Sequence, residues 1–151
     1  MAIIYQAEET AMPHIHKREV SKWIKEVAAM YGKDIESISY IFCSDEYILR
    51  INNQYLKHDY YTDIITFDYS LNNDISGDIF ISTDTVKSNS QKYKTDYNEE
   101  LHRVIIHGIL HLCGINDKSS EERADMTEKE NKALEMLNRI STEKTFTNTR
   151  D

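Results

Sequence analysis

The sequence lacks the features that mark secreted and membrane proteins. Its 151 residues contain only two cysteines, Cys43 and Cys113, which cannot build a disulfide framework, so a reduced, cytoplasmic protein is the simpler expectation. The N-terminus has neither a basic start nor a long apolar run, which argues against a signal peptide. No apolar stretch approaches membrane-spanning length, so we expect no membrane segment.

The sequence also has few features that would divide it into separate domains. Pro13 is the only proline, and no internal repeat, linker or low-complexity segment divides the chain. The length and an apolar share of 40% suit one domain with one hydrophobic core. We predict a single domain over residues 1–142, followed by a polar, frayed tail at residues 143–151.

The sequence has fewer basic than acidic residues. Lysine and arginine number 18 against 26 acidic residues, which gives a net charge of -8. Proteins that bind nucleic acids usually present a basic surface because they neutralise phosphates. Much of the acid lies between Glu121 and Glu135, however, and cations are dispersed through the preceding half of the chain. Composition alone therefore counts mildly against a nucleic-acid partner.

Hydrophobic periodicity predicts both helices and strands. Apolar residues recur at helical spacing from about Lys17 to Tyr31, and Ser44 is expected to cap a second helix. Alternation indicates a half-buried strand at 35–43, and the runs at 63–69 and 77–82 form a hairpin around Asn72-Asn-Asp. Ser119-Ser-Glu-Glu122 is a capping box that opens a long last helix. The expected architecture is an α+β domain in which about five helices cover a small mixed sheet.

The segment from His107 to Asp117 contains the residues that could bind a metal ion. His107 and His111 are four residues apart, so a helix places both imidazoles on one face, within reach of one ion. Gly114 is expected to end that helix, because glycine adopts the left-handed conformation at little cost. The chain can then fold back, and Asp117 is the first acid available as a third ligand. Three protein ligands leave a coordination position open, as in catalytic metal sites.

Two alternatives stand beside this interpretation. A pair of histidines on an apolar helix is often structural, and the glycine and the acid are what favour a metal. A zinc-peptidase helix has the pattern His-Glu-x-x-His with the glutamate as general base, whereas this chain has Gly108 after His107. The helix therefore offers no base for a peptidase, and no other residue is assigned as the general base.

The pattern His-Gly-x-Leu-His-Leu-x-Gly, followed by a short polar turn, resembles the signature of the YbeY family. These are bacterial metal-dependent endoribonucleases of ribosomal RNA maturation. Gly77-Asp-Ile resembles a second family block, and Asn52-Asn-Gln-Tyr55 with Thr62-Asp-Ile-Ile-Thr-Phe67 resembles a third. The match runs from about Ile35 to Glu135. The resemblance also implies an α+β fold like the one expected from periodicity.

Two positions depart from the family pattern. The family usually has a third histidine where this chain has Asp117, so one ligand is replaced by another type. The family also usually has an arginine directly after the block's tyrosine, where this chain has Leu56 followed by Lys57. By the resemblance this loop lies near the substrate, and Lys57 and His58 are the candidate substrate contacts.

The resemblance implies a metallohydrolase domain that cleaves single-stranded RNA, with 16S rRNA 3′-end processing and ribosome quality control as its setting. Ribosomal RNA and ribosomal particles are then the expected partners. Zinc is the expected metal, with manganese, nickel or cobalt as alternatives. A metallohydrolase of another class, such as a peptidase, and a non-catalytic ribosome-assembly module are the alternative functions.

Overall fold

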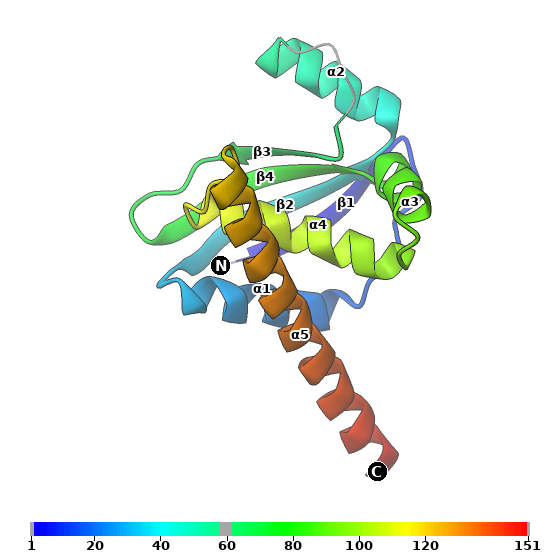
Figure 1. The fold of residues 1–151 in the computed structure, drawn as a ribbon, viewed down its shortest axis with the longest axis vertical. Helices are drawn as coiled ribbons and strands as arrows, with labels where there is room; N and C mark the ends of the chain where they lie inside the picture. The colour runs from blue at the N-terminus through cyan, green and yellow to red at the C-terminus, as the bar shows by residue number, and fades with distance from the viewer. Residues whose placement is uncertain (1, 58–61, 151) are drawn as a thin grey trace.

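A computed structural model gives the fold of residues 2–57 and 62–150, with side chains described as far as residue 141 (Figure 1). Strands and helices alternate irregularly along the chain. Their order is β1 (Ala2–Glu8), α1 (Lys17–Met30), β2 (Asp34–Cys43), α2 (Asp45–Leu56), β3 (Ile64–Asp68), β4 (Asp74–Ser82), α3 (Thr83–Lys92), α4 (Tyr97–Leu112) and α5 (Ser120–Arg150).

The four strands form one mixed sheet in the order β1-β2-β4-β3. β2 pairs in parallel with both β1 and β4, while β3 pairs with β4 as an antiparallel hairpin. The predicted hairpin and the α+β class are therefore confirmed. The parallel pairing of β2 with β4 requires a crossover, which α2 and β3 provide.

Helices cover both faces of the sheet, but unequally. The main core lies where α1, α4 and α5 pack on one face, with Tyr40 and Phe42 of β2 among its fully buried residues. A smaller cluster lies under α2 and contains Cys43, Ile48 and Ile65. Figure 1 shows the sheet between α2 and the α1–α4 layer, with α5 crossing that layer.

Local sequence signals account for the helix boundaries. Ser44 caps α2 by accepting a hydrogen bond from the Tyr47 amide, as expected from the sequence. The polar stretch after β4 forms the helix α3, which Ser82 caps by accepting a hydrogen bond from the Thr85 amide. α5 continues to Arg150, and the boundary between a domain ending at 142 and a frayed tail stays a prediction. Within the described ranges, no helix is both long and apolar enough to cross a bilayer.

Candidate metal centre

Helix α4 carries two of the three predicted metal ligands, and its packing fixes their direction. Asp96 caps the helix by accepting a hydrogen bond from the Glu99 amide at 3.2 Å. Gly108 allows α4 to lie close to the hairpin, because a Cβ atom there would be 3.1 Å from methyl groups of Ile64 and Ile79. His107 and His111 of the same helix remain partly exposed.

The end of α4 turns the chain back toward these histidines. Gly114 has a φ of +94°, in the left-handed region that favours glycine. Its amide donates to the His111 carbonyl at 2.9 Å, and the Ile115 amide donates to the Leu110 carbonyl at 3.1 Å. The helix stop predicted at Gly114 is therefore confirmed, and the reversal brings Asp117 alongside α4.

The structure brings His107, His111 and Asp117 together. One potential ligand atom from each lies within 4.8 Å of the others. Oδ2 of Asp117 is 3.3 Å from Nε2 of His107 and 3.2 Å from Nε2 of His111, so one carboxylate oxygen faces both imidazoles. The two rings are nearly perpendicular, at 83°, with centroids 4.5 Å apart. Nitrogen and oxygen donors of this kind suit zinc and other first-row divalent ions.

A buried acid behind the histidines was missed in the sequence. Glu130 of α5 is only 7% exposed, and its Oε2 is 2.6 Å from Nδ1 of His107. Its Oε1 accepts a hydrogen bond from Arg103 at 2.9 Å. A signal was present in the sequence, because Glu130 lies between Met126 and Ala133, two apolar residues of α5 that are buried in the core.

Charge around the site favours a positive imidazole at His107 when no metal is bound. Burial lowers the pKa of His107, but the hydrogen bond and charge of Glu130, with Asp117 and Asp63, outweigh it and raise the pKa above its usual value. Burial also raises the pKa of Asp63, although the charge of His107 opposes this. Asp63 precedes β3 and is a second acid near the site that the sequence did not single out.

Comparison with known proteins points to the same family as the sequence motifs do. A family model described as "Endoribonuclease YbeY" matches residues 4–138. The chain belongs to the YbeY family. Proteins named Endoribonuclease YbeY include one from Parabacteroides distasonis, 66% identical over 91% of this chain and 96% of its own length. The corresponding protein of Bacteroides thetaiotaomicron is 62% identical over 90% of this chain and 99% of its own length.

A solved structure supports the fold independently. The solution structure of TM1509 from Thermotoga maritima aligns with a TM-score of 0.65 at 23% identity, covering 99% of this chain and 96% of that one. At this identity the likeness establishes the fold alone. The mixed sheet and its helices are thus shared with a distant protein.

The predicted substrate contacts follow the YbeY block at the end of α2. Lys57 ends this helix with a left-handed backbone, φ +57°, and an exposed side chain. Its ammonium has no hydrogen-bond or ion-pair partner within residues 2–57 and 62–141, so the geometry does not join it to the metal-ligand group. His58 lies outside the described residues. The role of both in substrate binding stays a prediction.

Proposed function

We propose that this protein is a metal-dependent endoribonuclease that cleaves single-stranded RNA during ribosomal RNA maturation. The observation that carries the proposal is the convergence of His107, His111 and Asp117, with ligand atoms within 4.8 Å, in a chain of the YbeY family. The processing of the 16S rRNA 3′ end and ribosome quality control are the proposed setting. Ribosomal particles are the proposed partners, and the cytoplasm is the proposed location.

The donor set fits one divalent ion, and zinc is the metal we propose. Two imidazole nitrogens and one carboxylate oxygen supply three ligands and leave a position for water or substrate. A bound divalent ion lowers the pKa of its water and polarises a phosphoryl oxygen, which favours phosphodiester hydrolysis near neutral pH. The chain's own part is to hold the ion through three preorganised side chains at the end of a buried helix.

The environment of Gly108 argues against a peptidase mechanism. The Cβ atom of a glutamate at this position would lie 3.1 Å from methyl groups of Ile64 and Ile79, so these side chains would have to shift. Position 108 is thus packed against the hairpin, whereas His107 and His111 remain partly exposed. The sequence therefore lacks the general base of a zinc peptidase, and the tight packing around Gly108 disfavours a larger residue there.

RNA cleavage with a metal requirement is the direct test. We expect the purified protein to cleave single-stranded RNA, to stop when a chelator removes the metal, and to recover when zinc is added. His111→Ala should lower cleavage by at least about 100-fold because a ligand is lost. His14→Ala is the control, since His14 is exposed and distant in sequence from the site, and it should retain full activity.

Three results would contradict the proposal. RNA cleavage that continues after a chelator has removed the metal would show that the reaction does not require a metal ion. A metal-loaded protein that leaves RNA intact but binds ribosomal particles would indicate an assembly module. Cleavage of peptides rather than RNA would indicate a hydrolase of another class.

A further inference from the structure

Glu130 is a buried carboxylate that joins helix α5 to the metal-ligand group. Both of its oxygens are used, because Oε1 accepts from Arg103 and Oε2 lies against Nδ1 of His107. We infer that Glu130, held by Arg103, is a positioning residue that keeps the Nε2 lone pair of His107 free for the metal. The inference rests on the proposed metal site and assigns a role to residues outside the ligand set.

The burial of Glu130 indicates a specific role. An ionised carboxylate with a side chain only 9% exposed is costly unless it is paired and hydrogen-bonded. Arg103 supplies the pairing charge at 2.9 Å and is itself fixed by a second hydrogen bond, at 2.8 Å, to Asn131. Glu130 and Asn131 are neighbours on α5, so the guanidinium connects two helices. This arrangement leaves Oε2 fixed in position as an acceptor.

The direction of the hydrogen bond decides which nitrogen of His107 can bind a metal. An ionised carboxylate accepts hydrogen bonds and does not donate them, so the proton between His107 and Glu130 lies on Nδ1. In a neutral imidazole the other nitrogen, Nε2, then carries the lone pair. Nε2 is the atom that faces Asp117, at 3.3 Å from its Oδ2. Carboxylates that accept from the far nitrogen of a histidine are known to orient metal ligands and raise their basicity.

The arrangement of α4 makes His107 the ligand that depends on α5. Arg103, His107 and His111 follow one another at four-residue steps on one face of α4. Arg103 and His107 both contact Glu130, whereas His111 faces Asp117. Loss of Glu130 should therefore affect His107 first and leave the other two ligands in place.

Glu130→Gln separates this role from simple packing. Arg103 can only donate, so the glutamine carbonyl must face Arg103 and its NH₂ group must face His107. The NH₂ group then donates to Nδ1, which moves the ring proton to Nε2, where the metal should bind. The substitution keeps size and shape but reverses the tautomer. A residue with only a structural role would not move the proton.

The experiment measures both the tautomer and the metal affinity in the full-length chain. Two-bond ¹H–¹⁵N correlation spectra of the metal-free protein, at a pH where the imidazole is neutral, identify the protonated nitrogen of His107. We expect Nδ1–H in the wild type and Nε2–H in Glu130→Gln. Competition with a chelator should show zinc binding about 10–100-fold weaker in Glu130→Gln.

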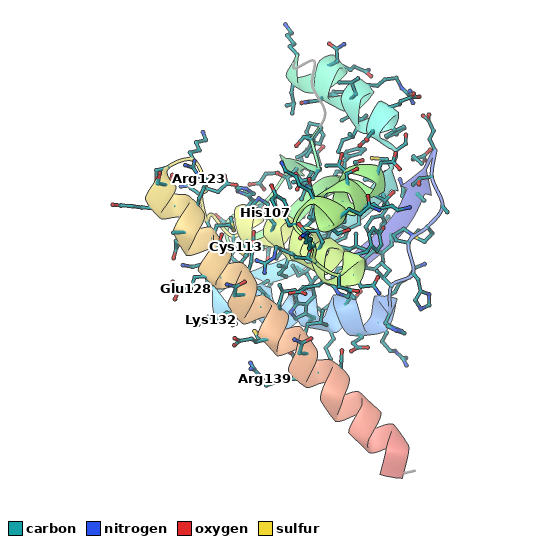
Figure 2. The ribbon with its side chains drawn as sticks, turned by 45° about the vertical axis from the view of Figure 1, so that its right-hand side comes forward. His107, Cys113, Arg123, Glu128, Lys132 and Arg139 are labelled. Carbon is teal, nitrogen blue, oxygen red and sulfur yellow. The ribbon has the colours of Figure 1, made fainter. Side chains whose placement is uncertain are left out.

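Glu128→Gln is the matched control. Glu128 lies on the same helix, labelled in Figure 2, and is exposed, so its loss removes the same charge without touching His107. We expect the Glu128→Gln protein to keep the wild-type tautomer and zinc affinity. Far-ultraviolet circular dichroism verifies that both variants fold.

The outcomes distinguish this inference from the proposed function. If wild type binds no zinc, the proposed function fails. If wild type binds zinc but Glu130→Gln keeps Nδ1–H, or binds zinc within about twofold of wild type, the positioning role is wrong. If Glu130→Gln does not fold, the tautomer of His107 in the wild type still tests the positioning role. An Nε2–H form in the metal-free wild type would overturn the inference.

Discussion

Asp117 brings a negative charge to a pair of imidazoles at the position where the family pattern usually has a third histidine. Its Oδ2 lies 3.2 and 3.3 Å from the two Nε2 atoms, which is the position we propose for the third ligand. A carboxylate makes the bound ion less electrophilic and suits harder metals than a third imidazole does. The metal preference of this site should therefore depend on residue 117.

Asp117→His should keep the metal but change its selectivity. We expect the variant to bind one zinc per chain and to bind manganese less well than wild type does, because oxygen donors suit manganese and imidazole suits zinc. Competition between the two ions on wild type and variant measures this shift. Asp117→Ala, which removes the ligand, should weaken zinc binding in the same assay. Loss of zinc binding in Asp117→His itself would mean that residue 117 is not a ligand.

The two cysteines should be unreactive at neutral pH. Burial raises the pKa of Cys43 to about 12, helped by the negative charges of Asp45, Asp84 and Glu9. Burial raises the pKa of Cys113 to about 11, although Lys33 opposes the shift. An ordinary thiol has a pKa of about 8.5, so at pH 8 the thiolate population of both should be at least about 100-fold lower. Modification by a disulfide reagent, followed in native protein and in urea, should show that difference in rate. A Cys113 that reacts natively as fast as in urea would contradict the assigned environment.

At the scale of elements, the site depends on how α5 begins as well as on α4. The capping box predicted at its start is present: the Glu122 amide donates to the Ser119 hydroxyl at 3.1 Å, and the Ser119 amide donates to the Glu122 carboxylate at 2.9 Å. This start lies between Asp117 and Glu130 in sequence. The capping box fixes where α5 begins, and Glu130 of this helix contacts His107 of α4.

Glu122→Gln should destabilise the protein in a pH-dependent way. The hydrogen bond from the Ser119 amide holds the pKa of Glu122 below its usual value. A depressed folded pKa contributes stability above the unfolded pKa, and this is lost as pH falls through the folded value. The midpoint of thermal unfolding should therefore be lower in the variant at pH 7, and this gap should be smaller at an acid pH below the depressed pKa of Glu122. Glu121→Gln, an exposed neighbour, is the control. An equal gap at both pH values would contradict this account.

At the scale of the whole molecule, local patterns predicted most of the elements and all three residues of the candidate ligand group. The four-residue step from His107 to His111 follows from the helical period, and Gly114 explains how Asp117 returns to it. The strand order β1-β2-β4-β3 could not be predicted in the same way, because alternation within a strand does not identify its neighbours. Glu130 was missed because its partner Arg103 is 27 residues away in sequence. A contact between residues that are far apart in sequence produces little local sequence pattern. Here its only sign was one acidic residue within the apolar stripe of α5.

The last part of α5 should be dispensable. Figure 1 shows the helix extending past the body of the protein, and Ser141, which donates to Glu19 of α1, is the last residue whose side chain is described. Truncation after residue 142 should leave the unfolding midpoint and zinc affinity close to wild type. Truncation after Met136 also removes Leu137, which is buried in the main core, and should cost more than about 2 kcal/mol. Similar destabilisation by both truncations, measured in urea, would contradict the predicted boundary at residue 142.

A crystal grown with zinc, with anomalous diffraction recorded at the zinc edge, tests the central claim most directly. We predict one peak per chain, about 2.0–2.2 Å from Nε2 of His107, Nε2 of His111 and a carboxylate oxygen of Asp117. Nδ1 of His107 should remain against Glu130. A zinc-loaded chain with the peak elsewhere, or with zinc on Nδ1 of His107, would contradict the site on which the proposed nuclease activity depends.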